Sequence, residues 1–536
     1  MKYKVLDANA ACARIAYKFS ELAPIYPITP SSPMAEECEH LKNIGEKNLF
    51  GEKLTLVEMQ SEAGASGALH GGLLGGVLGV TFTASQGLLL MLPNMFKMAG
   101  ECLPAVIHVS ARAVASHALS IFGDHSDVMA TRSSGFAYLC SSSVQEAQDL
   151  AAIAHISAIK SQLPFVHFFD GFRTSHEIQK IETLTDEELL KLLPQKEIAI
   201  FKQRCLNPQL PKQFGTAQNP DVFFQNREAN NLLYQKLPNI VMQNMEDFEK
   251  LTGRSYKPFD YVGDKNAKYV IVSMGSSVET IEDFLNNSKL KEKVGLIKVR
   301  LYRPFSKGYF LNILPKTAKK IVVLDRTKES GSVGEPLYLD VCACLNALDR
   351  KIEIIHGRYG LGGKEFDSNS VASILENLFA NNSISPFTVG IEDDKTNLSL
   401  KNSNLIDSYT PPKEYEMLFY GLGSDGTISA NKNSIKTIGE NTNKFVQGYF
   451  EYDSKKSGSL TVSHLRVSNK PIKRIYEVKN ADFIAIHNFS FLTRFKTLDR
   501  LKNGGIVLLN TKLNKKDISC LPNSFKKELI EKNAKL

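Results

Sequence analysis

Residues 104–170 begin with PAVIHVSA (Pro104–Ala111), continue through VQEAQDLAAIAHISAIK (Val144–Lys160) and end with PFVHFFD (Pro164–Asp170). The first and last segments have the length and apolar content of buried strands, whereas the middle segment has the periodicity of a helix. Alternation of strand and helix predicts a doubly wound, mostly parallel sheet. We therefore expect an α/β domain in this part of the chain.

The same alternation continues further along the chain. KYVIVSMGSSVETIEDFL (Lys268–Leu285) predicts a strand, a glycine turn and a helix. Further strands are predicted in GLIKVRLYRPF (Gly295–Phe305), AKKIVVLDRT (Ala318–Thr327), EMLFYGLG (Glu416–Gly423), DFIAIH (Asp482–His487) and GGIVLLN (Gly504–Asn510). These segments predict several α/β domains rather than one.

We expect three domains, over residues 1–255, 256–410 and 411–536. The polar stretch from Gln195 to about Asn226 interrupts the first domain and is predicted to lie along its surface. Asp393–Lys413 is rich in Asn, Ser, Thr and Pro, which is typical of a linker. The third domain has few predicted strands and is expected to be incomplete.

The composition indicates a globular protein. Of the 536 residues, 43% are hydrophobic and 23% are charged, which excludes a disordered, collagen-like or coiled-coil chain. The eight cysteines are scattered without a Cys-x-x-Cys pair, so we expect no disulfide framework, metal site or iron–sulfur cluster here. The N-terminus lacks the apolar core of a signal peptide, and a cytoplasmic location is expected.

One uncharged stretch, Ala63–Phe96, could be mistaken for a membrane span. Its eight glycines, its polar residues and Pro93 make it a poor solute in hydrocarbon. A buried helix followed by a strand is the favoured interpretation.

Positive charge is concentrated in the last quarter of the chain. Residues 411–536 contain 22 basic and 12 acidic residues, whereas the whole chain has a net charge of +8. Such an excess favours an anionic partner, such as a nucleotide, a phosphorylated cofactor or an acidic protein. The alternative is a lysine-rich surface in contact with water.

Three candidate residues lie in the first domain. YPITPSSPMAE (Tyr26–Glu36) is a proline-stiffened loop whose hydroxyls could position a substrate, or an ordinary connection with a helix N-cap at Ser31–Ser32. Glu62 precedes the uncharged stretch and could take part in proton chemistry, or complement a helix dipole. Arg112 follows a predicted strand, where it could bind a substrate carboxylate or pair with a surface acid.

A further candidate lies in the third domain. GLGSDGT (Gly421–Thr427) follows a predicted strand and opens a helix, as phosphate-binding turns do. The full dinucleotide fingerprint is absent, so a plain tight turn remains the alternative.

A series of sequence blocks in all three predicted domains is specific to one protein family. The blocks from the first domain are YPITPSSPMAE, TLVEMQSEAGASGALHG, TFTASQGLLLM, HVSARAVASHALSIFGDHSDVMATR and PFVHFFDGFRTSHEIQKIE. Later blocks are GRYGLGGKEF, GLGSDGTISANKNSIKTIG and QGYFEYDSKKSGSLTVSHLRV. Together they strongly resemble the N-terminal half of pyruvate:ferredoxin (flavodoxin) oxidoreductases. The resemblance implies a pyrimidine-binding domain, a transketolase C-terminal-like domain and part of a CoA-binding domain.

The resemblance also implies an activity and site residues. The family decarboxylates pyruvate oxidatively on thiamine diphosphate, forms acetyl-CoA and passes electrons through iron–sulfur clusters to ferredoxin or flavodoxin. By resemblance, Thr29 and Arg112 bind pyruvate, and Glu62 hydrogen-bonds N1′ of the cofactor's aminopyrimidine. The residues implied to contact CoA are Gly423, Ser424, Asp425, Gly426, Thr427 and Lys455.

The resemblance leaves parts of the family pattern unmatched. The [4Fe-4S] clusters and the Mg²⁺ that holds the diphosphate are expected from a C-terminal portion that this chain does not contain. We expect either a second polypeptide that completes a homodimeric anaerobic enzyme, or a truncated fragment that retains at most CoA binding or dimerisation. Another 2-oxo acid, such as 2-oxoglutarate, is an alternative substrate, and neither nucleic acid nor a membrane is an expected partner.

Overall fold

A computed structural model describes residues 2–451 and 459–536 of the chain. It comprises two compact units. The larger unit contains Ala8–Ser175 and Leu184–Thr410, and the smaller unit contains Met1–Asp7, His176–Thr183 and Pro411–Leu536.

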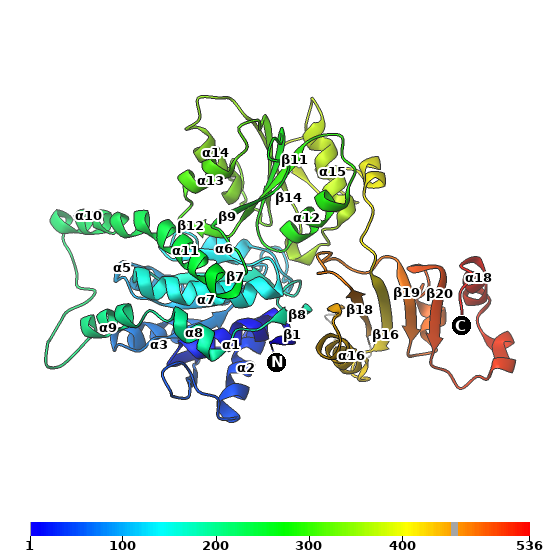
Figure 1. The fold of residues 1–536 in the computed structure, drawn as a ribbon, viewed down its shortest axis with the longest axis horizontal. Helices are drawn as coiled ribbons and strands as arrows, with labels where there is room; N and C mark the ends of the chain where they lie inside the picture. Colours follow the sequence, from blue (N-terminus) through cyan, green and yellow to red (C-terminus); the bar gives the residue numbers. More distant parts are fainter. Residues whose placement is uncertain (1, 452–458) are drawn as a thin grey trace. The chain divides into compact units, whose positions relative to one another are not determined.

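The first part of the larger unit is an α/β layer structure (Figure 1). Its strands are β2 (Leu22–Ile25), β3 (Thr55–Glu58), β4 (Val80–Thr83), β5 (Val106–Ala111), β6 (Ala137–Cys140) and β7 (Phe165–Asp170). Its helices are α1 (Ala8–Phe19), α2 (Ser32–Asn43), α3 (Glu62–Leu74), α4 (Ser85–Leu90), α5 (Leu92–Gly100), α6 (Ser126–Ala130), α7 (Val144–Ser161), α8 (Asp186–Leu192), α9 (Gln195–Arg204), α10 (Pro220–Ala229) and α11 (Asn231–Thr252).

The sheet of this first part has the strand order β12-β6-β7-β5-β4, in which β12 is Leu301–Arg303, and all neighbouring strands are parallel except β12 and β6. Strands β2 and β3 form a parallel pair next to β4. Every residue of β5 and β7 is buried, as expected for strands covered on both faces. Helix α7 begins at the N-cap Ser143 and packs against β7 and α11 (Figure 1).

The second part of the larger unit is a doubly wound domain. Its strands are β9 (Phe259–Gly263), β10 (Tyr269–Ser273), β11 (Val294–Val299), β13 (Lys320–Asp325), β14 (Glu353–Arg358) and β15 (Phe387–Thr388), while β12 (Leu301–Arg303) joins the first sheet. Helices α13 (Lys307–Ile313) and α14 (Pro336–Leu345) contribute to one core, and α12 (Ser277–Asn287) and α15 (Ser368–Phe379) to another. The helices therefore cover both faces of the sheet, as Figure 1 shows.

The smaller unit is built on a seven-stranded sheet with the order β1-β8-β17-β18-β16-β19-β20. Its strands are β1 (Tyr3–Asp7), β8 (Ile178–Glu182), β16 (Tyr415–Leu422), β17 (Phe445–Glu451), β18 (Leu460–Ser468), β19 (Ala481–Ile486) and β20 (Leu501–Leu509). Its α-helices are α16 (Thr427–Asn441), α17 (Phe491–Arg494) and α18 (Asn523–Glu531), and the chain's 3₁₀ turns are Leu361–Gly363, Asn404–Ser408 and Lys515–Cys520.

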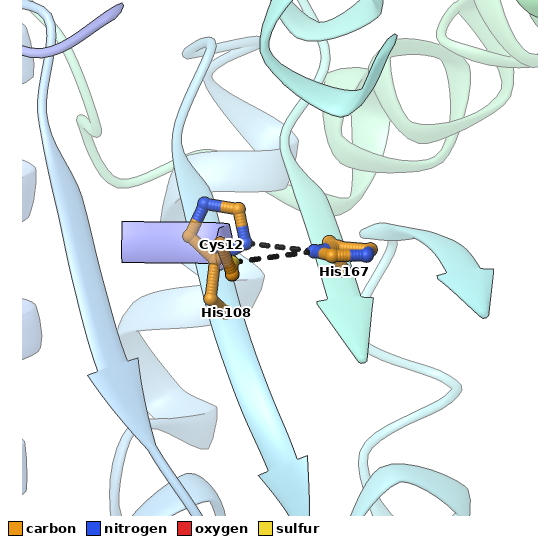
Figure 2. A group of neighbouring side chains, drawn as sticks. All are labelled: Cys12, His108 and His167. Atoms are coloured by element: carbon orange, nitrogen blue, oxygen red, sulfur yellow. Dashed lines mark hydrogen bonds between the residues drawn. The ribbon is translucent and has the colours of Figure 1, made fainter. Parts of the chain in front are cut away.

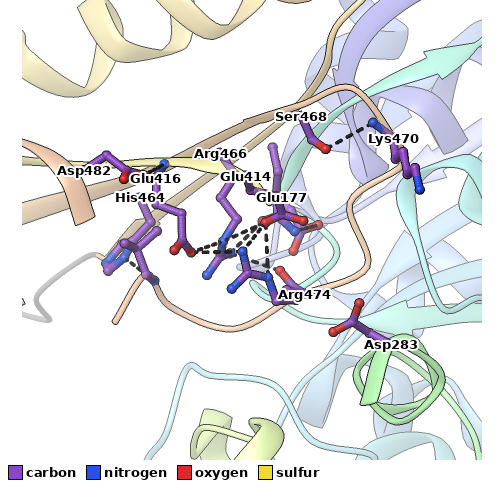
Figure 3. Close-up of polar contacts among 12 residues, drawn as sticks. Glu177, Asp283, Glu414, Glu416, His464, Arg466, Ser468, Lys470, Arg474 and Asp482 are labelled. Atoms are coloured by element: carbon purple, nitrogen blue, oxygen red, sulfur yellow. Dashed lines mark hydrogen bonds and ion pairs between the residues drawn. The ribbon is translucent and has the colours of Figure 1, made fainter. Parts of the chain in front are cut away.

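Buried ion pairs connect the strands of the smaller unit (Figure 3). Arg466 Nε lies 3.0 Å from a carboxylate oxygen of Glu416, and Arg474 Nη2 lies 2.5 Å from Glu414. Arg466 Nη1 also donates to the side chain of Gln447, whose amide donates in turn to Glu177. The network thus links the segment that contains β8 to β16, β17 and β18.

The predicted α/β class and the predicted strands and helices are confirmed, with three differences. The seven-stranded sheet is mixed rather than mostly parallel, because the hairpin β17–β18 and the strands β1 and β8 pair in antiparallel fashion. Two strands from within residues 1–255 thereby belong to the sheet of the last domain. The polar stretch Gln195–Asn226 contains α9 and the beginning of α10, and α9 buries Ile198 and Phe201.

Candidate active site at the carboxyl edge of the first sheet

The structure brings Thr29 and Arg112 together. Arg112 follows β5 directly, and Thr29 lies in the loop after β2, so both occupy the carboxyl edge of parallel strands. Arg112 Nη1 donates to the Thr29 carbonyl oxygen at 2.7 Å, and Nε donates to the Ser120 carbonyl oxygen at 3.3 Å. Among the described residues, nothing accepts a hydrogen bond from Nη2. The buried guanidinium is thus fixed on two sides and can still bind an external carboxylate.

The loop that carries Thr29 is held by the Ser31 hydroxyl. This buried hydroxyl donates to the Thr83 carbonyl oxygen at 2.5 Å and accepts from the Ser110 amide at 3.2 Å. Helix α2 does begin after Ser31, as the N-cap alternative predicts, but the Ser31 side chain makes no capping bond. The hydroxyl ties the loop to β4 and β5 instead.

Glu62 is the first residue of α3, whose N-cap is Ser61, so the helix-dipole alternative describes its position correctly. Its side chain is buried at 7% exposure, yet no described residue forms a hydrogen bond or ion pair with the carboxylate. Gly87 lies against it: a Cβ there would be 2.8 Å from Glu62 Oε1 and 2.5 Å from Thr83 Oγ1. The Thr83 hydroxyl is also buried without a described partner. The Glu62 carboxylate, which has no described protein partner, and the buried, unpaired Thr83 hydroxyl therefore flank Gly87.

Asp127 connects these two parts of the site, although no sequence motif points to it. Its Oδ2 accepts the backbone amides of Ser85 at 2.7 Å and of Arg112 at 2.9 Å. Burial raises the pKa of Asp127 to about 7, although hydrogen bonds from these amides act in the opposite direction. The Asp127 carboxylate thereby links two segments. One follows β4 and leads to Gly87, and the other follows β5 and begins with Arg112. Nothing in the sequence distinguishes it from Asp124 nearby.

The predicted CoA-binding turn belongs to the smaller unit. It connects β16 to α16 and has positive φ angles at Ser424 (74°) and Gly426 (88°). The Asp425 carboxylate accepts the amides of Leu422 at 2.7 Å and Thr427 at 2.8 Å, so the turn is stabilised internally. The amide of Thr427, at the start of α16, is thereby already paired with a carboxylate. Lys455 lies outside the described residues.

A cysteine and two histidines lie close together in the core of the first sheet (Figure 2). The Nδ1 atoms of His108 and His167 are 2.9 Å apart, and Cys12 Sγ is 3.8 Å from His167 Nδ1. The remaining ring nitrogens contact His155 at 3.1 Å and Ser141 at 2.7 Å. Every nitrogen of His108 and His167 therefore has a protein partner. We interpret the group as a hydrogen-bonded core cluster rather than a metal site.

Three family models match the chain. Residues 14–246 match pyruvate flavodoxin/ferredoxin oxidoreductase, thiamine diphosphate-binding; residues 267–371 match pyruvate:ferredoxin oxidoreductase core domain II; and residues 416–536 match pyruvate ferredoxin/flavodoxin oxidoreductase. The chain belongs to the pyruvate:ferredoxin/flavodoxin oxidoreductase family. The family expected from the sequence blocks is thereby confirmed.

Members of the family match along the whole chain. The pyruvate:ferredoxin oxidoreductase of Moorella thermoacetica is 55% identical over 100% of this chain and 46% of its own length. The probable pyruvate-flavodoxin oxidoreductase of Escherichia coli is 50% identical over 99% of this chain and 46% of its own length. The chain therefore spans about half the length of the curated relatives it matches.

A solved structure supports the fold. A 2-oxoglutarate:ferredoxin oxidoreductase from Magnetococcus marinus, with 2-oxoglutarate, coenzyme A and succinyl-CoA bound, superposes with a TM-score of 0.53 at 16% identity. The match covers 71% of this chain and 66% of that one. Among the described residues, no helix is long and apolar enough to cross a membrane. Residues 63–96 form α3, β4, α4 and part of α5, as the favoured interpretation predicted.

Proposed function

We propose that this chain is the pyruvate- and aminopyrimidine-binding part of a pyruvate:ferredoxin (flavodoxin) oxidoreductase. The assembled enzyme converts pyruvate and CoA to acetyl-CoA and CO₂ and passes two electrons to ferredoxin or flavodoxin. The observation that carries the proposal is the pairing of Arg112 with the Thr29 loop, together with the link through Asp127 from Arg112 to the turn that packs against the buried Glu62. The high identity to named pyruvate enzymes supports pyruvate over other 2-oxo acids.

In this proposal, Arg112 binds the substrate carboxylate. Its Nη1 and Nε are oriented by backbone carbonyl oxygens, and Nη2 is left for the substrate. A planar guanidinium binds a carboxylate with defined geometry, which a lysine ammonium cannot reproduce. The exposed Thr29 supplies a hydroxyl on the same side of the site. Together the two residues orient pyruvate with its keto carbon at the carboxyl edge of the sheet.

The residues around Glu62 fit the aminopyrimidine of thiamine diphosphate. A buried carboxylate without a protein partner suits a ligand ring that presents a protonated nitrogen, and the absent side chain at Gly87 lets the Glu62 carboxylate and the Thr83 hydroxyl approach the backbone at that point. When bound, the cofactor supplies the nucleophilic carbon that attacks the keto group of pyruvate. Glu62 accepts and holds the proton at N1′.

The binding sites of CoA, Mg²⁺, the iron–sulfur clusters and the electron acceptor are proposed from the sequence resemblance, the charge and the length of the relatives. We propose that Gly423–Thr427 and Lys455 contact CoA, because their motifs resemble the family's and residues 411–536 carry a charge of +10. Since the relatives are about twice as long, we propose that Mg²⁺, the iron–sulfur clusters and the electron acceptor bind to sequence outside this chain. A complementary polypeptide would then complete a dimeric enzyme.

An anaerobic pull-down tests the proposal. The tagged chain is isolated from its native cell and assayed for reduction of a viologen dye that depends on pyruvate and CoA. We expect activity together with a partner chain that contains cysteine clusters. Glu62→Gln keeps the shape of the side chain but removes the proton acceptor, and it should lower turnover by about 10²–10⁴-fold. Absence of activity in every fraction, with no such partner, would refute the proposal.

A further inference from the structure

The second domain of the larger unit contains a topological switch point. Strand β10 pairs in parallel with β11 on one side and with β13 on the other. The chain leads from β10 to β11 on one side of this point and from β13 to β14 on the other, so the strand order reverses between the neighbours β10 and β13. In open α/β sheets, ligands bind in the crevice outside the carboxyl ends of the strands at such a point. The crevice here is formed by the residues that follow β10 and β13.

These residues have the chemistry of an anion site. Gly275 follows β10 with φ +75°, and the Ser276 amide lies at the start of α12. Arg326 follows β13 and is buried. A backbone amide at the start of a helix, beside a guanidinium and a glycine without a side chain, is the arrangement that binds phosphate or carboxylate groups in many α/β proteins.

A carboxylate of the chain itself occupies this crevice. Asp170, the last residue of β7, is wholly buried there. Its Oδ2 accepts from the Ser276 amide at 2.9 Å and lies 2.6 Å from Arg326 Nη1, while Oδ1 lies 2.5 Å from His125 Nε2. A Cβ on Gly275 would be 3.1 Å from each carboxylate oxygen. Burial acts to raise the pKa of Asp170, but Arg326 and His125 hold it well below its ordinary value.

Gly171, the residue after Asp170, packs against the two segments that form the candidate active site. The Gly171 amide donates to the Ala111 carbonyl oxygen at 2.9 Å, next to Arg112. A Cβ on Gly171 would be 2.4 Å from that oxygen and 3.0 Å from the side chain of Pro30, next to Thr29. Fixing Asp170 therefore also fixes the backbone on which the Arg112 and Thr29 segments pack.

We propose that the switch-point crevice of the second domain is an anion socket that holds the Asp170 carboxylate in place of a ligand. Asp170 is thus a positioning residue. It fixes the backbone on which the segments of the candidate active site pack, by binding to the second domain. When its side chain is removed, the socket accepts a free monocarboxylate of the size of formate. This inference does not depend on the activity proposed above.

Anion rescue of Asp170→Gly tests the proposal with the full chain. Thermal unfolding is followed in sodium formate and in sodium chloride at equal ionic strength. We expect the variant to melt several degrees below the wild type in chloride, because the buried Arg326 loses its carboxylate and keeps only neutral partners. Formate should raise the melting temperature of the variant progressively with concentration, as ligand binding to the folded state does, and should leave the wild type unchanged relative to chloride.

Two control variants separate binding in the socket from a general salt effect. Asp170→Asn keeps the volume of the side chain and blocks the socket, so it should be destabilised without recovering in formate. Asp170→Gly combined with Arg326→Gln removes the guanidinium and should also lose the recovery. Equal melting of Asp170→Gly in formate and chloride would overturn the proposal.

If Asp170→Gly does not fold in chloride, refolding from urea provides the same test. The recovered fraction of monodisperse protein is compared after dilution into formate or chloride. A higher recovery in formate for Asp170→Gly, but not for Asp170→Asn, is expected. Equal recoveries in the two salts would refute the socket.

Discussion

The backbone amide of Arg112 donates to the carboxylate of Asp127 at 2.9 Å. The same carboxylate oxygen accepts the amide of Ser85, at the start of α4. One buried acid thus sets the distance between the chain that carries the guanidinium and the turn that leads to Gly87, against which Glu62 packs. Asp127 thereby holds the segment of the predicted substrate residue Arg112 in register with the turn that packs against the predicted cofactor residue Glu62.

Asp127→Ala should therefore impair the assembled enzyme without removing a group that contacts substrate. Displacement of a binding group by about 1 Å can cost about 10²-fold, and we expect a loss of that order in kcat/KM for pyruvate. Steady-state kinetics with the viologen dye measures it. Asp221→Ala, at an exposed position of α10, is the matched control and should behave like the wild type. Unchanged kinetics in Asp127→Ala would contradict the positioning role.

Arg112→Lys tests the geometry of the proposed carboxylate clamp. The substitution keeps the positive charge but removes the planar fork, so the KM for pyruvate should rise by roughly 10–100-fold. Arg132→Lys serves as the control, because Arg132 pairs with the partly exposed Glu329 at 3.0 Å. If Arg112→Lys and Arg132→Lys had the same KM, Arg112 would not bind the substrate carboxylate.

The buried histidine cluster should make the protein sensitive to acid. Burial lowers the pKa of His155 and of His167 to about 3 and lowers that of His108 well below its ordinary value. The unfolded chain therefore binds more protons below about pH 6.5, and the stabilising contribution of each neutral ring is lost progressively as the pH falls towards 3. One pH unit below 6.5, the cost is about 1.4 kcal/mol for each histidine.

His155→Phe tests this pH dependence, since the ring that replaces His155 can still stack on Phe19. The free energy of unfolding is measured by urea denaturation at pH 7.5 and pH 5.5. The difference between the two pH values should be about 1.4 kcal/mol smaller in the variant than in the wild type. The exposed His117 provides the control substitution His117→Phe. An identical pH difference in wild type and His155→Phe would rule out the predicted role.

Removal of one member of the buried ion network should destabilise the smaller unit, because a buried charge then loses a partner. Arg466→Met removes one partner of the buried Glu416, which also lies near Arg474 and Lys502, and should lower the free energy of unfolding by about 3–5 kcal/mol. Lys527→Met breaks the exposed pair with Glu531 and should change the free energy of unfolding by less than about 1 kcal/mol. Urea denaturation of both variants measures the contrast. A small effect of Arg466→Met would show that Arg474 alone neutralises the carboxylates.

The sequence alone determined the local elements and the family. Strands β5 and β7 and helix α7 were predicted nearly to the residue, because buried strands and core helices leave a periodic pattern of apolar residues. The motifs that carry Thr29, Glu62 and Arg112 are likewise apparent in the sequence, since each is a short contiguous block. The candidate site residues could therefore be predicted from the sequence alone.

Only the tertiary structure decided how distant segments meet. The pairing of β8 with β17, the contact of Asp170 with Arg326 and the bridge from Asp127 to Ser85 join residues far apart in the sequence. Such contacts depend on which strands become neighbours and on which buried polar groups must find partners, and neither condition appears as a local periodicity. For that reason Asp127 and Asp170, both wholly buried, could not be distinguished from other acidic residues until the fold brought their partners to them.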